Sequence, residues 1–408
     1  MTAYPLAWIR SQYPALAQDA PTDKVFLDNA SGAQVPRQVI EAFTHTLTTM
    51  NVNKGGAYRS SVRVTEAKEA VRAQVANFLN APSVANVVFG PNASTLIELL
   101  AQSFGQTLEP GSEIIVSGLE HHANRDPWRR LERLGAVVKT WSVREGGRLE
   151  VADLDDLLSP KTRLVALTAA SNALGTMPDI EAASERVHAA GALLMVDAVA
   201  YAPHGLPDVQ AWDADLLVFS PYKVFGPHLG VLYLSDALLG NLIPPKLSFL
   251  PEGEPIAWEP GTQNHEAIVG FGGTFGYLDA VAAELGVQTT GRAAWEAVFA
   301  AFAEHERVLF EKLLTGLGRL GATCYGLLGT AGRTATVSLN LGAYAPQRVA
   351  EHLATRGITA AAGHFYAYDL MMRSLGLLER GGAVRLSLLH YNSEHDVEAV
   401  LDALAELA

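Results

Sequence analysis

The sequence predicts an α/β protein with a large, doubly wound, mostly parallel sheet and a smaller α+β unit near its C-terminal end. From about residue 25 to residue 285, short β-rich runs alternate with amphipathic helical stretches, and this alternation implies right-handed β–α–β crossovers. The runs LLMVD and LLVFS are nearly continuous in apolar residues, as in strands that are buried on both faces of a parallel sheet. Beyond about residue 287, long helical stretches separate fewer strands, which indicates a second unit.

We therefore expect a large domain over residues 24–285 and a small domain over residues 1–23 and 286–408. Residues 1–23 are assigned to the small domain because they precede the first strand of the large domain, which we place at about Val25. The expected strands of the large domain are Ser112–Ser117, Leu164–Thr168, Leu193–Asp197, Leu216–Phe219 and Gly230–Leu234. The expected helices between them are Ser94–Gln106, Asn124–Leu134 and Ile180–Ala190.

The small domain is expected to begin with one long helix and to continue with two strands and two further helices. These elements are Ala293–Leu317, Thr336–Leu341, a helix from Ala345, Val384–Leu389 and Ser393–Leu407. In open parallel sheets the ligand binds outside the carboxyl ends of the strands. The residues that directly follow each strand of the large domain are therefore the first candidates for a functional site.

The composition is that of a globular protein. Of the 408 residues, 49% are hydrophobic and 18% are charged, which is enough apolar material for a large core. The formal charge of −13 argues against a nucleic-acid partner, because proteins that track phosphates carry a basic excess. The single cysteine, Cys324, excludes an internal disulfide and a cysteine-rich metal site, and no metal is expected.

The sequence contains no long uncharged apolar stretch and no basic segment followed by an apolar one at its start. A membrane-spanning helix needs about 18 or more such residues, and a secretory signal has the second pattern. We therefore expect a cytoplasmic location and no membrane partner.

Two strand ends carry residues that suit one cofactor. The run LLMVD ends on Asp197, and the run LLVFS is followed by Ser220, Pro221, Tyr222 and Lys223. Taken singly, each is more simply a capping acid or a solvated lysine. Taken together, they match pyridoxal phosphate, which needs a lysine for a Schiff base and an acid beside its pyridinium nitrogen.

Other strand ends add candidates of the same kind. Ala93 and Ser94 begin a helix after a strand, where free N–H groups favour a phosphate, although a simple helix cap explains them equally well. Of the two histidines that follow Ser117, His121 suits stacking on an aromatic cofactor, whereas His122 is treated as an ordinary loop residue. Asn172 follows another strand and could donate to a ring substituent or to a substrate carboxylate.

In these motifs the chain resembles the class V aminotransferase family of fold-type I pyridoxal-phosphate enzymes, and in particular the cysteine desulfurases. The resemblance covers nearly the whole length. It rests on WIRSQYPAL (8–16), VFLDNASGAQVP (25–36), EHHAN (120–124), SNALG (171–175), SPYKVFGPHLGVLYL (220–234), EPGTQN (259–264) and VRLSLLHYN (384–392).

The resemblance implies a role for each matching residue. Lys223 matches the lysine that forms the Schiff base (aldimine), Asp197 the partner of the pyridinium nitrogen, and His121 the imidazole stacked on the ring. Arg385 matches the arginine that binds the substrate α-carboxylate, and a bidentate guanidinium suits that task. The remaining cofactor residues implied are Ala93, Ser94 and Ser220 at the phosphate, Asn172 and Tyr222 near the ring, and Thr262, which reaches the phosphate of a neighbouring subunit. A homodimer with sites at its interface is therefore expected.

The departures from the family concern the desulfurase chemistry. The position of the family's nucleophilic cysteine holds Tyr366 here, and Cys324 lies in a segment that matches a structural strand. Ala200, Tyr222 and Ala361 replace a glutamine, a histidine and an arginine of the family. A persulfide needs a thiolate that attacks the substrate sulfur. The chain therefore resembles a desulfurase-like subgroup that lacks the catalytic cysteine.

The leading hypothesis is an enzyme that acts on an amino acid as a lyase, by C–S cleavage or β-elimination, without a persulfide. The alternatives are an aminotransferase or an epimerase, and then a non-catalytic homologue that binds the cofactor or a partner. Tyr366, Tyr222 and His364 are candidates for a second acid, with His364 also placed at the substrate, although each is as readily a packing residue.

Overall fold

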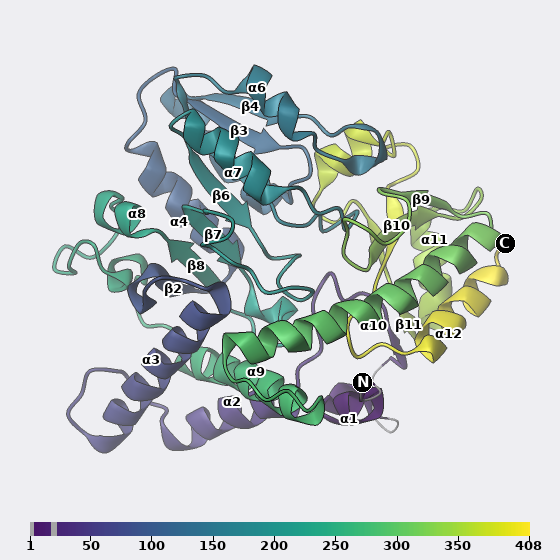
Figure 1. Cartoon of the computed structure of the whole chain (residues 1–408), viewed down its shortest axis with the longest axis horizontal. Helices are drawn as coiled ribbons and strands as arrows, with labels where there is room; N and C mark the ends of the chain where they lie inside the picture. Colours follow the sequence, from purple (N-terminus) through teal and green to yellow (C-terminus); the bar gives the residue numbers. More distant parts are fainter. Residues whose placement is uncertain (1–3, 18–22) are drawn as a thin grey trace.

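The computed structural model describes residues 4–17 and 23–408; residues 1–3 and 18–22, part of the segment expected in the small domain, lie outside the described residues. Its central sheet has seven strands in the order β2-β8-β7-β6-β5-β3-β4 (Figure 1). Their bounds are β2 Val87–Gly90, β3 Glu113–Ser117, β4 Val137–Trp141, β5 Thr162–Thr168, β6 Leu193–Asp197, β7 Leu216–Phe219 and β8 Gly230–Leu234. Of these seven strands, β8 runs antiparallel to the other six, so the predicted mostly parallel sheet is confirmed.

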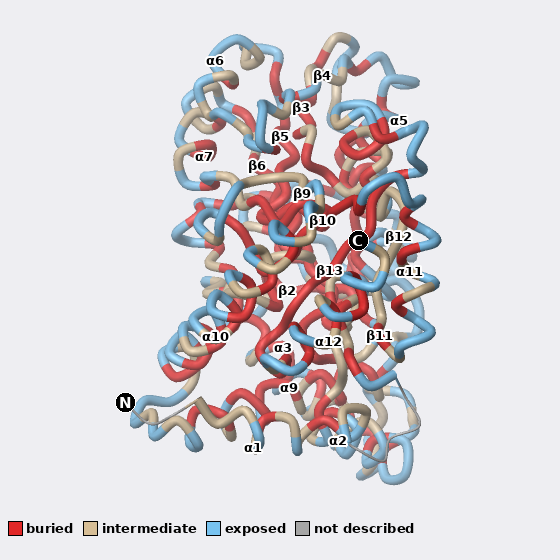
Figure 2. Tube along the Cα trace, turned by 90° about the vertical axis from the view of Figure 1, so that its right-hand side faces the viewer, coloured by how far each residue is buried: buried red, intermediate tan, exposed pale blue. Residues whose placement is uncertain are grey.

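Helices cover both faces of this sheet, and buried segments gather along its middle (Figure 2). Side chains alternate along each strand, so Leu194 and Val196 join one apolar core while Met195 joins the other. The first core includes α3 (Arg59–Leu79), α7 (Ile180–Ala189), α9 (His265–Glu284) and α10 (Arg292–Arg319). The second includes α4 (Ala93–Gly105), α5 (Asp126–Arg130) and α8 (Asp236–Asn241). Two further helices of this part are α2 (Arg37–Thr49) and α6 (Leu154–Leu157).

The predicted continuous helix Asn124–Leu134 is wrong. The segment forms a 3₁₀ turn at His122–Asn124, the short α5 helix and a second 3₁₀ turn at Leu131–Leu134. Arg125 has φ −123° and ψ −55°, outside helical geometry. Pro127 lies two residues later and has no N–H to bond to the preceding turn, so the chain restarts its helix there.

The C-terminal unit is a second sheet, with the order β12-β13-β10-β9 and antiparallel pairing. Its strands are β9 Thr323–Tyr325, β10 Thr336–Asn340, β12 Ala361–Gly363 and β13 Ala383–Ser387. Apolar residues of this sheet pack with α10, α11 (Pro346–Thr355) and α12 (Glu394–Ala405). The predicted α+β unit is therefore confirmed, with helix ends within two residues of those expected. In the described residues, no helix is both long and apolar enough to cross a membrane.

The first strand does not join the large sheet, and that prediction is wrong. β1 (Val25–Phe26) pairs in parallel with β11 (Ile358–Thr359) of the C-terminal unit. Val25 and Leu27 are buried in the core of the same unit. An apolar run indicates that a strand forms, but its partner here comes from a segment far along the chain, which local sequence does not reveal.

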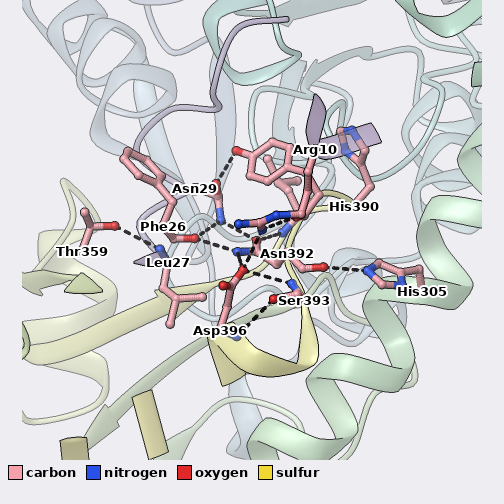
Figure 3. A network of polar contacts seen from close by, with 12 residues as sticks. Arg10, Phe26, Leu27, Asn29, His305, Thr359, His390, Asn392, Ser393 and Asp396 are labelled. Carbon is pink, nitrogen blue, oxygen red and sulfur yellow. Dashed lines mark hydrogen bonds and ion pairs between the residues drawn. The ribbon is translucent and has the colours of Figure 1, made fainter. Parts of the chain in front are cut away.

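The N-terminal residues are fastened to the last part of the chain by a polar network (Figure 3). Arg10, in α1 (Leu6–Ser11), has its Nη1 3.2 Å from Asp396 Oδ2. Asn29 Nδ2 donates to Ser387 O at 2.7 Å and to Asn392 Oδ1 at 3.1 Å. The two ends of the described chain therefore hold each other in place beside β13, which carries Arg385.

Candidate active site

Five strand-end segments meet around a single cavity. Lys223 follows β7, Asp197 ends β6, Asn172 follows β5, His121 follows β3, and Ser94 begins α4 after β2. The cavity measures about 950 Å³, and its lining includes Ala30, Ser31, Ser94, Glu98, His121, His122, Asp126, Asn172, Tyr222, Lys223, His364, Phe365, Tyr366 and Arg385. A smaller adjoining hollow of about 60 Å³ adds Ala93, Asp197 and Ser220. The carboxyl ends of the strands therefore converge as expected.

The surroundings of Lys223 lower the pKa of its amine and so favour the neutral, nucleophilic form. The residue is buried in the short turn Pro221–Lys223 that follows β7. Burial and then the Arg385 guanidinium lower the pKa of Lys223 to about 8, against the opposing effect of Asp197 and Asp28. A lysine with a depressed pKa exposes its lone pair near neutral pH, which is what covalent attack on a carbonyl requires.

Asp197 is a buried acid that lines the same small hollow as Lys223. Its Oδ1 accepts a hydrogen bond from Val199 N at 2.9 Å. Burial raises the pKa of Asp197 to about 6, while that backbone donor and Lys223 hold it lower than burial alone would. The group is therefore mainly a carboxylate at neutral pH, and a protonated ring nitrogen is a suitable partner for it.

His121 is a neutral imidazole with a defined tautomer. Its Nδ1 accepts a hydrogen bond from Ala123 N at 3.0 Å, which places the ring proton on Nε2. Burial, followed by the charge of Lys223, lowers the pKa of His121 to about 3. Its ring centroid lies 5.4 Å from that of Tyr366, at an angle of 34°.

Glu120, directly before His121 in the chain, is a buried carboxyl that the sequence-based prediction does not include. The carboxyl group is buried and contacts Ser117 Oγ at 2.5 Å, Thr168 N at 2.6 Å and Asn124 Nδ2 at 2.8 Å. Burial and the nearby Asp197 raise the pKa of Glu120 well above its ordinary value. Its position directly before His121 in the EHHAN motif was the available signal, but its partners come together only through β3–β5 pairing.

The start of α4 offers an anion seat beside Asp197. Asn92 caps the helix by accepting from Thr95 N at 2.8 Å, which leaves earlier N–H groups for a ligand. Gly230 of β8 allows close approach at this point, because a Cβ there would lie 2.4 Å from the carbonyl carbon of Asn92. Ala93, Ser94 and the buried Ser220 line the same hollow.

Arg385 is a buried guanidinium on the opposite wall. It donates to Asn172 O at 2.9 Å, to Ser31 Oγ at 2.7 Å and to Asp28 Oδ1 at 3.1 Å. The Phe365 ring covers it, with the guanidinium carbon 4.6 Å from the ring centroid. Its Nε is buried and has no hydrogen-bond partner in residues 4–17 and 23–408, so the group retains donor capacity for an anionic ligand.

The loop after β12 closes the cavity mouth in a strained shape. Phe365 and Tyr366 both have left-handed backbone geometry, with φ of 53° and 57°, which costs a non-glycine residue about 1–3 kcal/mol. Asn172 Nδ2 donates to Phe365 O at 2.7 Å, and His122 N donates to Tyr366 O at 2.8 Å. Tyr366 itself is 70% exposed, and His364 lines the mouth beside it.

Thr262 and Cys324 lie outside this cavity, whereas Tyr222 and His122 line it. Tyr222 lines the cavity and stacks on His228, with centroids 5.0 Å apart and planes at 7°. Thr262 is exposed and lines a separate hollow of about 430 Å³. Cys324 lies in β9 on a further hollow, whose lining does not include Lys223. His122, treated as an ordinary loop residue in the sequence analysis, instead lines the main cavity.

The residues that meet here fit pyridoxal phosphate. They supply an amine, a ring-nitrogen partner, a flat imidazole and a helix N-terminus for the phosphate around one hollow. Asn172 Oδ1 is buried there with no hydrogen-bond partner among the described residues. An unpaired buried acceptor is costly, and a donor on the cofactor ring would satisfy it.

Comparisons with known proteins agree with this assignment. The aminotransferase class-V family profile matches residues 25–400. The aminotransferase-like protein FGM3 of Gibberella zeae is 35% identical over 414 residues, covering 97% of this chain and 96% of that protein. A cysteine desulfurase of Pectobacterium atrosepticum is 32% identical over 429 residues, covering 99% and 98%.

Solved structures show the same fold. The apo cysteine desulfurase of Thermococcus onnurineus NA1 superposes with a TM-score of 0.88 at 27% identity, covering all of this chain and 98% of that one. The cysteine desulfurase CsdA of Escherichia coli, in its S-sulfonic acid form, gives a TM-score of 0.82 at 29% identity, with 98% of both chains covered.

Proposed function

The chain belongs to the aminotransferase class-V family of pyridoxal-phosphate enzymes, and on that premise we propose that it is an amino-acid lyase of desulfurase-like type. It would cleave the bond between Cβ of the substrate and its substituent, by C–S cleavage or β-elimination, without a persulfide intermediate. The observation that carries the proposal is the cavity itself, where Lys223, Asp197 and Arg385 converge while Tyr366 stands at the mouth and the chain's one cysteine lies elsewhere.

The cofactor would be held by residues of the smaller hollow. Lys223 would bind it covalently, Asp197 its ring nitrogen, and His121 one face of its ring. Asn172 and Tyr222 would lie at the ring edge, with Ala93, Ser94 and Ser220 at the phosphate. When bound, pyridoxal phosphate stabilises negative charge at the substrate Cα.

The protein's own part is to orient the substrate and to move protons. Arg385 would bind the α-carboxylate through a charge-assisted contact, while Asp28 and Ser31 hold the guanidinium in place. The Lys223 amine, once free and neutral, would take the Cα proton. The candidates to donate a proton to the group that leaves Cβ of the substrate remain Tyr366, Tyr222 and His364.

The test is the absorption spectrum of the purified protein, followed by titration with cysteine, alanine and other amino acids. A visible band that shifts with an amino acid, with pyruvate formed from a β-substituted one, supports the lyase. Amine exchange that depends on a keto acid would instead support an aminotransferase, the function in the name of the Gibberella zeae relative; Cα inversion alone would support an epimerase. A colourless protein that pyridoxal phosphate does not reconstitute would point to a non-catalytic homologue.

Replacing the cysteine should leave catalysis intact. In Cys324→Ser the turnover should equal that of the wild type, because burial raises the pKa of the Cys324 thiol and the residue lines a different hollow from Lys223. Product formation per minute at saturating substrate measures this. A Cys324→Ser variant that folds normally by circular dichroism but has lost turnover would support a mechanism that uses the Cys324 thiol.

Removing the guanidinium should weaken substrate binding. Arg385→Ala loses charge-assisted hydrogen bonds worth about 1.5–3 kcal/mol, so the apparent affinity for an amino acid should fall by about 10–150-fold. Spectral titration with the amino acid gives the affinity directly. Arg385→Lys, which keeps charge but not the fork, should recover part of the loss; equal affinity in all three proteins would remove Arg385 from the site.

We also propose a homodimer, because Thr262 is exposed and outside the cavity of its own chain. A threonine so placed would serve the phosphate seat of a second copy. Sedimentation equilibrium gives the mass, which should be twice the 43.5 kDa of one chain; a monomer with full cofactor affinity contradicts the proposal.

A further inference from the structure

A histidine–carboxylate pair lies on the wall of the substrate cavity and has no part in the mechanism above. His122 and Asp126 both line the cavity that holds Lys223 and Arg385. His122 Nδ1 lies 3.3 Å from Asp126 Oδ2. The backbone N–H of His122 donates to Tyr366 O at 2.8 Å, so the main chain at His122 is tied to the loop that carries Tyr366.

The pair sets which ring nitrogen of His122 carries the proton. A carboxylate beside Nδ1 requires a hydrogen there, so the neutral ring has its lone pair on Nε2. Burial is the largest influence on the pKa of His122 and lowers it, with Arg125 and His364 acting in the same direction and Asp126 opposing them. Nε2 is therefore a hydrogen-bond acceptor at neutral pH.

That acceptor is unsatisfied. His122 Nε2 is buried and has no hydrogen-bond partner within the described part of the chain. A site with an unpaired polar group discriminates strongly between ligands that satisfy the group and isosteric ligands that do not. A donor on a bound molecule in this cavity would meet the unpaired nitrogen.

We propose that His122 is a specificity-determining residue that selects substrates whose side chain carries a hydrogen-bond donor, a hydroxyl, thiol or N–H group, with Asp126 as its positioning residue. The inference rests on the proposed amino-acid-binding function and names the substrate class for it. Amino acids with purely apolar side chains of equal size would bind at the same α-carboxylate contact but leave Nε2 unpaired.

The test uses three pairs of amino acids that differ only by hydroxyl against methyl. These pairs are L-serine and L-2-aminobutyrate, L-homoserine and L-norvaline, and 5-hydroxy-L-norvaline and L-norleucine. Each is titrated into the holoenzyme, and the shift of the visible band gives its affinity. The wild type should prefer the hydroxyl member of at least one pair by about tenfold or more, and His122→Leu should reduce that preference to within about twofold.

A second histidine–carboxylate pair provides the matched control. His188 Nδ1 lies 2.9 Å from Asp213 Oδ2, and its Nε2 lies 2.9 Å from Asp215 Oδ2. His188 precedes β6 and the two aspartates precede β7, whereas Lys223 follows the other end of β7. His188→Gln should leave the hydroxyl preference unchanged. A preference that is absent from the wild type, or is as large in His122→Leu, overturns the inference.

The tautomer is measured without cofactor or substrate. Long-range ¹H–¹⁵N spectra of the apoprotein should show His122 protonated at Nδ1, and Asp126→Ala should shift the proton toward Nε2 and reduce the hydroxyl preference. A wild-type ring protonated at Nε2 would contradict the assignment. If no amino acid shifts the band of the cofactor-loaded protein, the amino-acid function fails and the inference fails with it, whereas equal shifts within every pair reject His122 alone.

Discussion

Lys223→Ala is expected to abolish covalent attachment of pyridoxal phosphate. Lys223 carries the one primary amine among the residues that line the hollow beside Asp197 and the start of α4, and its depressed pKa favours attack on the cofactor aldehyde. Borohydride reduction followed by mass spectrometry should show one added cofactor in the wild type and none in the variant. Turnover should fall by at least about 10²–10⁴-fold, the usual contribution of a positioned general base.

Lys161→Ala is the control, because Lys161 is exposed in the turn before β5 and outside both hollows. It should retain both the reducible adduct and full turnover. A cofactor adduct that persists in Lys223→Ala would mean that another amine is the attachment site.

The same lysine sets a pH dependence for cofactor binding. A pKa of about 8 for Lys223, below the ordinary value of about 10.4, means that the reactive neutral amine forms as the pH rises toward 8. The rate of attachment to apoprotein should therefore increase with pH, reach half of its maximum near pH 8 and level off about one pH unit higher. Stopped-flow absorbance at fixed cofactor concentration measures it; a rate that still climbs near pH 10 contradicts the depressed pKa.

Glu259→Leu is expected to cause the largest loss of stability. The Glu259 carboxylate meets Arg72 Nη1 at 2.8 Å, and the two side chains are 1% and 5% exposed; Glu259 Oε1 also accepts from Phe89 N at 3.0 Å. Removing the Glu259 carboxylate leaves the buried Arg72 with the half-exposed Glu69, 3.0 Å from its Nε, as its remaining ion partner. Breaking a buried ion pair costs up to about 3–5 kcal/mol. Urea unfolding, with the midpoint and slope fitted together, measures the difference in the free energy of unfolding.

A double variant separates the ion pair from the space that it fills. Arg72→Leu with Glu259→Leu removes both charges and should recover much of the loss, because apolar replacement of a buried pair is often tolerated. Glu304→Ala, which removes a partner of Arg307 at the surface, should change stability little. A Glu259→Leu loss no greater than that of Glu304→Ala would contradict a structural role for the pair.

The central sheet could be predicted from sequence because its strands carry a local signal in their amino-acid pattern. β6, β7 and β8 have the predicted bounds to the residue, since each is a short apolar run that is buried on both faces. β1 was assigned to the wrong sheet because its partner, Ile358–Thr359, is chosen by tertiary packing. The break in the helix at Arg125 was missed, although Pro127 was the available signal.

Some residues of the candidate site could likewise be predicted from sequence, and others could not. Lys223, Asp197, His121 and Asn172 could be proposed because the carboxyl ends of parallel strands share one edge, and the structure brings them together. The Glu120 cluster could not, because Thr168 reaches it from another strand. His122 and Asp126 carried a signal that was overlooked: residues four apart with complementary hydrogen-bonding groups directly after a strand.

The contacts between residues early and late in the chain have a consequence for biosynthesis. Arg385, which lines the substrate cavity, donates a hydrogen bond to Asp28, 357 residues away in the sequence. β1 can pair only after its partner strand β11 has been synthesised. Chains emerge from the ribosome N-terminus first, so the α/β sheet can be complete while the carboxylate-binding wall does not yet exist. A nascent chain that has not yet released β13 could therefore take up cofactor-like ligands at the sheet edge without binding an amino acid. Activity appears only after Arg385 has emerged and reached Asp28.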